Sequence, residues 1–293
     1  MMEPAQLAAL AACHRRGSFD LAAADLHVTP SAISQRIKAL EEVVGTLLLV
    51  RSQPCTATPT GLRLIRHLAE ISLLDHALAA DLPTRAPAAA TLRIAVNADS
   101  LATWVITALA ATQGYLFDLV IDDQDISQDR LKRGDVVAAI TSHPGPLQGC
   151  DTLALGAMRY HATASPGYLA RWLPMGATAS ALARAPALTF SDHDRLQHLW
   201  VARHIPTAEP RESFPSHRIA TSQGFVDACR AGLGWGMNPA ALIAADLASG
   251  ALVELLPGAT LDVALHWQFS RLTAAAIAPL TVAIQQAAKD QLI

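Results

Sequence analysis

An amphipathic helix is expected near the N-terminus, in the stretch VTPSAISQRIKALEEVVG at residues 28–45. Its polar stripe consists of Ser31, Ser34, Gln35 and Lys38, with Arg36 at the edge. Gln pairs bidentately with adenine, Ser donates or accepts a hydrogen bond, and Lys and Arg contact phosphates. The polar stripe therefore favours DNA recognition, although a helix face that is merely solvated is the plainer alternative.

The opposite side of this helix is apolar, as a packed helix requires. The apolar stripe consists of Ile33, Ile37, Leu40 and Val44. Thr29 is the expected N-cap, and Pro30 is the first helical residue, where a missing N–H costs nothing. The free amides around Ser31 lie at the positive end of the helix and suit a phosphate.

Two further helices and a wing complete this N-terminal module. One helix covers residues 4–16, and the Ala-rich FDLAAADLH, with Ser18 as N-cap, forms the next. A tight turn then leads into the helix at Pro30, which is a helix-turn-helix arrangement. TLLLVRSQPCTATPTG predicts two short strands around a turn. The residues expected to contact DNA are Thr29, Pro30, Ser31, Ser34, Gln35, Arg36, Lys38 and Arg51.

A long helix and a linker follow the wing. Pro59 follows a capping Thr58, and apolar residues at near-heptad spacing predict a helix over 59–80. The length of this helix and its place between two domains favour dimerisation over packing on its own domain. DLPTRAPAAAT has no periodicity and indicates a domain boundary. The expected boundaries are 1–58 for the helix-turn-helix module, 59–89 for the dimerising long helix with the linker, and 90–293 for the remaining domain.

The pattern changes after Leu92 to alternating strands and helices. LRIAV, YLFDLVI and DVVAAI are typical of buried strands, and SLATWVITALAAT is typical of the helix between the first two. This alternation predicts a mostly parallel α/β sheet. Further short units extend to DVALHWQF, and a helix is expected from Ala278 to Gln291. The pattern alone leaves open whether these units form one sheet or two lobes around a cleft.

Composition sets limits on the whole chain. With 293 residues, 52% of them hydrophobic, the chain can form two or three domains with sizeable cores. A net charge of -3 does not indicate a nucleic-acid binder, but residues 1–66 carry seven Lys/Arg against five Asp/Glu. The four cysteines are far apart and match no zinc spacing, so we expect buried or half-buried thiols, no metal and no cofactor.

Polar residues gather where the expected strands of the second domain end. The first strand is followed by Asn97, Asp99, Ser100 and Thr103. The second is followed by Asp122 and Asp123, and the third by Thr141 and Ser142. Ligands of α/β sheets bind at such strand ends, and free helix amides there suit a carboxylate. Hydroxyls and amides opposite carboxylates suit an amino acid with a cationic side chain; for the Asp cluster, a solvated loop is the alternative.

The N-terminal motif is long enough to resemble a known family. SFDLAAADLHVTPSAISQRIKALEEVVGTLLLVR, followed by CTATPTG, resembles the N-terminal domain of LysR-type transcriptional regulators, and the resemblance extends over the whole chain. It implies an α/β fold with an N-terminal winged helix-turn-helix, a long linker helix and a two-lobed, periplasmic-binding-protein-like effector domain. The lobes implied are about 90–161 with 267–293, and about 162–266.

Three stretches are similar to the lysine- and arginine-sensing (LysG- or ArgP-like) branch of that family: AVNADSLATW, RLKRGDVVAAI and LASGALVELLPG. That branch typically controls exporters of basic amino acids. The resemblance favours Asp122 and Asp123 as partners of a ligand cation. It also implies ligand contacts in the second lobe, from Asp194 in FSDHDRLQ and from Thr221 in ATSQGF.

The sequence of the second lobe differs at two positions from the lysine- and arginine-sensing branch that it resembles. Ser191 stands where an Asp usually follows the Phe, and Arg195 stands where a second Asp lies beside Asp194. A contribution from Asp194 therefore stays an expectation, and one from Asp192 has less support. Trp267, on the expected return strand, either packs near the site or fills the core.

We therefore expect a cytoplasmic, non-enzymatic regulator that binds double-stranded DNA at imperfect palindromes and takes lysine or arginine as effector. It would be a homodimer, with a homotetramer and an RNA polymerase contact as further options. The sequence has no H-E-x-x-H motif, no residues in the order of a catalytic triad and no phosphate-binding loop. Residues 100–117 are too polar for a membrane span. The alternatives are a regulator that senses another small molecule and an architectural chromosomal protein without operator preference.

Overall fold

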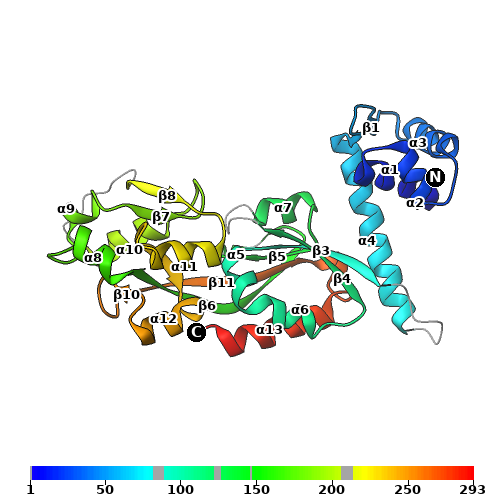
Figure 1. Cartoon of the computed structure of the whole chain (residues 1–293). Helices are drawn as coiled ribbons and strands as arrows, with labels where there is room; N and C mark the ends of the chain where they lie inside the picture. The colour runs from blue at the N-terminus through cyan, green and yellow to red at the C-terminus, as the bar shows by residue number, and fades with distance from the viewer. Residues whose placement is uncertain (1, 82–88, 122–126, 146, 206–213) are drawn as a thin grey trace. The chain divides into compact units, whose positions relative to one another are not determined.

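The computed structural model describes residues 2–81, 89–121, 127–145, 147–205 and 214–293. Internal contacts divide the chain into two units, Met1–Thr91 and Leu92–Ile293. Figure 1 shows the elements of each unit, most of them labelled.

The N-terminal unit is a winged helix-turn-helix followed by a long helix. Its elements are α1 (Pro4–Arg16), α2 (Phe19–Asp25), α3 (Pro30–Val44), β1 (Leu49–Val50), β2 (Thr56–Ala57) and α4 (Pro59–Asp81). Strands β1 and β2 pair antiparallel and form the wing. The winged helix-turn-helix expected from the sequence is confirmed.

The apolar stripe of α3 anchors this unit. Ile33, Ile37 and Leu40 are fully buried and lie in one core cluster with the small residues of α1 and α2. The Thr29 side chain accepts a hydrogen bond from the Ala32 amide at 3.2 Å, which caps the helix as expected. Burying one stripe of α3 leaves its opposite, polar stripe facing away from the core.

The C-terminal unit is built from α/β elements in two lobes. The first lobe contains β3 (Ala90–Val96), α5 (Ala98–Ser100), a π-helical turn (Leu101–Val105), α6 (Ile106–Ala110), β4 (Tyr115–Ile121), α7 (Ser127–Arg133), β5 (Ala138–Thr141) and α13 (Ala278–Gln291). The second lobe contains α8 (Pro166–Trp172), α9 (Ala179–Leu182), β7 (Ala187–Thr189), α10 (Leu196–His204), β8 (Ser216–Arg218), α11 (Ser222–Arg230), β9 (Gly236–Pro239), α12 (Ala240–Ser249) and β10 (Val253–Glu254).

Two long strands connect the lobes. β6 (Cys150–Ala164) and β11 (Thr260–Ser270) pair antiparallel from Thr260–His161 to Ser270–Cys150. Figure 1 shows both strands running the length of this unit, with one lobe at each end. The register shifts between Leu265 and His266, where β6 contains Gly156 at a φ of 121°.

The expectation of a mostly parallel sheet is wrong for this unit. The seven-stranded sheet has the order β10-β6-β11-β5-β3-β4, with β9 also on β6. β3 and β5 are parallel, but β6 pairs antiparallel with β9, β10 and β11, and β11 pairs antiparallel with β5. The long return strands run against the βα units that they connect, which local alternation does not reveal.

Trp267 and the four cysteines are buried in the cores of the two units. Trp267 is fully buried, and its indole N–H donates to Thr281 Oγ1 of α13 at 3.1 Å, so it fills the core of the first lobe. All four cysteines are buried and unpaired, as expected. Burial raises the pKa of the Cys13 thiol to about 11, which keeps it in its unreactive protonated form.

Candidate DNA-binding face and ligand pocket

The polar stripe of α3 is open to solvent in the N-terminal unit. Ser31, Gln35 and Lys38 are exposed, and Ser34 is partly exposed. Within the described residues, neither Ser34 nor Gln35 has a side-chain hydrogen-bond partner. These side chains are therefore available to an external partner such as a base edge.

The positively charged side chains of this face form only weak interactions within the unit. Lys38 Nζ lies 3.9 Å from Glu42 Oε1, with the two side chains 74% and 68% exposed. Such exposed pairs are weak, so Lys38 can exchange its partner for a phosphate at little cost. Arg36 is partly exposed beside the stripe.

The start of α3 and the wing contribute the remaining residues expected from the sequence. Pro30 is the first residue of α3, and the hydroxyls of Thr29 and Ser31 lie 3.0 Å apart. The guanidinium of Arg51 lies 5.7 Å from the centre of the Phe19 ring, a cation–π contact between wing and α2. Glu41 Oε1 accepts a hydrogen bond from the Leu48 amide at 2.8 Å, which holds the entry of the wing against α3.

An ion pair joins α1 to α2 in the same unit. Arg16 Nε donates to Asp25 Oδ2 at 2.7 Å, and Arg15 donates to the same oxygen at 3.2 Å. The hydrogen bond from Arg16 lowers the pKa of the Asp25 carboxyl to about 2, and Arg15 adds to this effect. The pair therefore keeps its charges through the whole physiological range.

A pocket of about 280 Å³ lies in the C-terminal unit, lined by residues of both lobes and β11. This volume is near the lower end of the ~300–1,000 Å³ range of small-molecule pockets. First-lobe residues of the lining are Asn97, Ala98, Asp99 and Ser142. Those from the second lobe include Phe190, Asp194, Arg195, Ser222, Phe225 and Asn238. The pocket thus requires both lobes.

Asp99 connects the two lobes inside this pocket. Its Oδ1 accepts a hydrogen bond from Ser222 Oγ of α11 at 2.6 Å, and its Oδ2 accepts one from the Tyr160 hydroxyl of β6 at 2.8 Å. Burial raises the pKa of the Asp99 carboxyl, the two hydrogen bonds oppose this rise, and the charge of Asp194 adds to it. Burial and the nearby carboxylate favour a cation beside Asp99.

Asp194 is held at the start of α10. Its carboxylate accepts hydrogen bonds from the amides of Phe190 at 2.9 Å and Leu196 at 3.1 Å, and from Gln197 Nε2 at 3.1 Å. These three donors fix the position of the carboxylate. Asp194 is therefore a pre-oriented negative group on the second-lobe wall.

Two helices of nine residues begin at the pocket. α10 begins at Leu196 and α11 at Ser222, and both residues belong to the lining. Helix N-termini carry free amides and partial positive charge, which favour a carboxylate. The pocket therefore combines two carboxyl groups, those of Asp99 and Asp194, with the N-termini of two helices.

The structure brings together part of the ligand set expected from the sequence. Asn97, Asp99, Ser142 and Asp194 line the pocket. The residues outside its lining are Ser100, Thr103, Thr141 and Thr221. Asp122 and Asp123 lie outside the described residues.

The four residues outside the lining are buried or form hydrogen bonds within the protein. Ser100 and Thr141 are fully buried, and the Thr103 hydroxyl donates to the Asp99 carbonyl at 2.6 Å. Thr221 caps α11 by accepting from the Gly224 amide at 3.2 Å, so its neighbour Ser222 lines the pocket instead. Asp192 is exposed and forms an ion pair with Arg218.

Sequence reasoning missed several pocket residues of the second lobe. Ser222, Phe225 and Asn238 line the pocket, and Tyr160 binds Asp99. The N-cap at Thr221 could have located Ser222, because the residue after a cap is the first residue of the helix, where ligands often bind. Asn238 gives no local signal, since it reaches the pocket only through the pairing of β6 with β9.

Two family models match the chain. Residues 4–62 match the model described as bacterial regulatory helix-turn-helix protein, lysR family, and residues 85–289 match the model of the LysR substrate binding domain. Neither model describes an enzyme family. Within the described residues, no helix is long and apolar enough to cross a membrane.

Several known proteins are similar over nearly the full chain. The transcriptional regulator LysG of Mycobacterium tuberculosis is 44% identical over 284 residues, covering 97% of this chain and 92% of its own. The crystal structure of ArgP from Mycobacterium tuberculosis matches with 42% identity and a TM-score of 0.84, covering 100% of this chain and 99% of its own. Full-length LysG from Corynebacterium glutamicum, with Arg bound as effector, matches with 34% identity and a TM-score of 0.71, covering 99% of each chain.

Proposed function

The chain belongs to the LysR family of bacterial helix-turn-helix regulators, and we propose that it is a transcriptional regulator whose effector is arginine or lysine. The observation that carries the effector assignment is the pair of carboxyl groups that line the pocket, Asp99 from the first lobe and Asp194 from the second. The similar LysG with bound Arg supports the same assignment.

The polar stripe of α3 is the proposed DNA-reading surface. Gln35 and Ser34 would read base edges in the major groove, and Lys38 would contact phosphate. Arg36, Arg51 and the helix start at Thr29, Pro30 and Ser31 would add contacts to the backbone. The solvent exposure of these residues supports this assignment.

The pocket suits an amino acid with a second positive charge. Its cationic end would pair with Asp99 and Asp194, where a charge-assisted hydrogen bond is strong. Its carboxylate would lie near the N-termini of α10 and α11. Asn97 and Ser142 would add polar contacts, and Asp122 and Asp123 stay proposed partners of the cation.

Ligand binding would regulate DNA binding through the two lobes. Because both lobes line the pocket, a ligand that contacts both favours one arrangement of them over others. In a homodimer, such a change alters the spacing of two DNA-binding units and therefore the affinity for an imperfect palindrome. We propose a cytoplasmic, non-catalytic homodimer that controls a gene for a basic amino-acid exporter.

Calorimetric titration of the full chain with single amino acids tests this function. Arginine and lysine should bind. Glutamate should not bind, because the carboxylates of Asp99 and Asp194 repel its side chain, and norvaline should bind much more weakly than arginine, because it has no side-chain cation. Binding of glutamate without binding of arginine or lysine would overturn the effector assignment.

A regulator with a different effector is the second candidate, because Arg195 and His193 also line the pocket. These side chains could hold an acidic ligand, and the glutamate arm of the titration tests that. An architectural chromosomal protein is separated by footprinting in excess competitor DNA. A discrete protected site upstream of a target gene supports the regulator, and uniform protection supports the architectural protein.

A further inference from the structure

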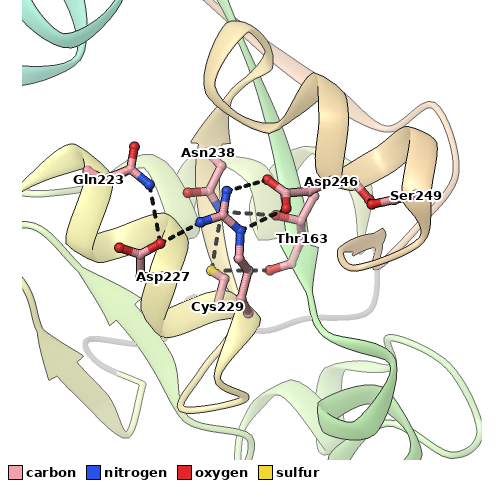
Figure 2. Close-up of polar contacts among 8 residues, drawn as sticks. Thr163, Gln223, Asp227, Cys229, Asn238, Asp246 and Ser249 are labelled. Carbon is pink, nitrogen blue, oxygen red and sulfur yellow. Dashed lines mark hydrogen bonds and ion pairs between the residues drawn. The ribbon is translucent and has the colours of Figure 1, made fainter.

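One pocket-lining residue has an unused hydrogen-bond acceptor. Asn238 of β9 is fully buried and belongs to the pocket lining. Its Nδ2 donates to Thr163 Oγ1 at 2.9 Å and to Cys229 Sγ at 3.2 Å, as Figure 2 shows. Its Oδ1 has no partner within the described residues.

The neighbours of Asn238 determine which way its amide group points. The Cys229 thiol donates to the Thr163 carbonyl oxygen at 3.7 Å, so the sulfur presents lone pairs rather than a proton to Asn238. Burial raises the pKa of this thiol to about 12, which keeps the proton on the sulfur. The amide must therefore place its NH₂ group toward Cys229 and its oxygen away from it.

An ion-pair network outside the pocket holds the helix that carries Cys229. Arg230 donates from Nε and Nη2 to the two carboxylate oxygens of Asp246, each at 2.7 Å, and joins α11 to α12. Asp227 adds a second ion pair to Arg230, and Gln223 donates to Asp227 at 3.2 Å (Figure 2). The anchoring of Asn238 therefore rests on a braced helix.

Buried acceptors without a partner are rare in folded proteins, and each one needs an explanation. We propose that Asn238 Oδ1 accepts a hydrogen bond from an N–H donor of the effector and thereby selects ligands that carry such a donor. Thr163 and Cys229 are positioning residues, because they fix the amide without touching the ligand. This inference rests on the proposed function, since it takes the pocket to be an amino-acid site.

The central variant is Asn238→Leu, which keeps the approximate volume and removes the acceptor. Calorimetry with the full chain should show about 10- to 100-fold weaker arginine binding, the effect of losing a hydrogen bond to a charged donor. Gln223→Leu is the matched control, because it removes an exposed amide from the same network outside the pocket lining. That control should bind arginine like the parent.

A second variant keeps the test informative if Asn238→Leu fails to fold. Thr163→Val preserves shape but removes one anchor of the Asn238 amide, so it should weaken arginine binding less, by about threefold to tenfold. Circular dichroism and thermal unfolding of the ligand-free variants establish that each is folded.

Two ligand analogues identify the donor. If Asn238 accepts from the α-ammonium, its loss should not affect binding of 5-guanidinopentanoic acid, which lacks that group. If it accepts from the side chain, its loss should not affect binding of norvaline, which lacks the guanidinium. A competition assay against a fluorescent arginine derivative measures these weaker ligands.

The outcomes separate this inference from the proposed function. Arginine binding by folded Asn238→Leu within twofold of the parent overturns the inference and leaves the function intact, as does an equal loss in Gln223→Leu. If Asn238→Leu is unfolded, unchanged binding by Thr163→Val overturns it. Failure of the parent to bind either arginine or lysine overturns the function, and the donor assignment then falls with it.

Discussion

The polar side chains of the α3 stripe and those of the pocket in the C-terminal unit differ in how many hydrogen bonds they make within the protein. Ser34 and Gln35 are at least partly exposed and lack side-chain hydrogen bonds within the described residues. Asp99 and Asp194 instead accept five hydrogen bonds between them from neighbouring side chains and amides. The first region is open to a partner, and the second is pre-arranged around one.

The difference follows from the size of the partner that each region would bind. DNA covers a large surface and supplies many weak contacts, so side chains of α3 can stay hydrated until the duplex arrives. A small amino acid supplies few contacts, and each must be oriented before binding to give useful affinity. Variants that affect one region alone therefore give the clearest tests.

The largest expected effect is on the pocket. Asp99→Ala removes a carboxyl group from the partly buried pocket and should weaken arginine binding by about 100-fold or more. Because burial raises the Asp99 pKa in the free protein, arginine binding should release protons and weaken as the pH falls. Calorimetry over pH 5 to 8 measures both effects.

Asp262→Asn is the matched control for Asp99→Ala, because Asp262 pairs with Arg159 on the same unit outside the pocket lining. It should bind arginine like the parent, and both variants should retain DNA affinity without ligand. Loss of ligand-free DNA binding in Asp99→Ala would mean that the carboxylate is needed for the fold rather than for the ligand.

The next effect is on the polar stripe. Gln35→Ala should lower the preference for operator over random DNA by about 1–3 kcal/mol, the usual contribution of a bidentate base contact. Lys38→Ala should weaken binding to both sequences and reduce the salt slope by about one. Fluorescence anisotropy at several salt concentrations measures the two responses. An unchanged operator preference in Gln35→Ala places base reading elsewhere.

A smaller effect is expected on the stability of the C-terminal unit, at the ion pair that joins α11 to α12. Asp246→Asn breaks the pair with Arg230 and should destabilise the C-terminal unit by about 1–2 kcal/mol at pH 7, less than a fully buried pair because Arg230 is partly exposed. Arg230 lowers the Asp246 pKa, so this stabilisation is present above the unfolded carboxyl pKa of ~3.9 and is lost as the pH falls further. The free energies of unfolding of the parent and of Asp246→Asn, measured with urea, should therefore differ at pH 7 and become equal in acid.

The smallest effect is expected in the N-terminal unit, at a solvent-screened pair. Asp25→Asn should lower thermal stability slightly at neutral pH and leave arginine binding unchanged. Because the Asp25 pKa is lowered to about 2, the difference from the parent should persist at pH 5 and disappear as the pH falls from about 4 to 2. Asp20→Asn, an exposed change on the same helix, is the control. An equal change in both variants contradicts a role for the pair.

Local sequence signals were sufficient for much of the fold. Thr29 and Pro30 start α3 as expected, and α13 covers Ala278–Gln291 as expected, because caps and apolar periodicity act over one or two turns. The long strand β6 was not foreseen, because it contains Gly156 at a positive φ and changes partners along its length. Its antiparallel pairings depend on segments about a hundred residues away.

The ligand site was less predictable for the same reason. Asn97 and Asp99 were accessible to reasoning because they directly follow a strand, where free helix amides are expected. Ser222 and Asn238 come to the same pocket only because β6 and β11 bring the second lobe to face the first. No single stretch of sequence indicates that the two lobes face each other.

The most direct test of the link between the two regions is a titration of operator affinity with arginine, using the operator found by footprinting. Operator affinity should change, with a midpoint at the arginine dissociation constant, and operator DNA should change arginine affinity by the same factor. Asp99→Ala should show no change at the same arginine concentrations. Arginine binding that leaves operator affinity constant would contradict the account.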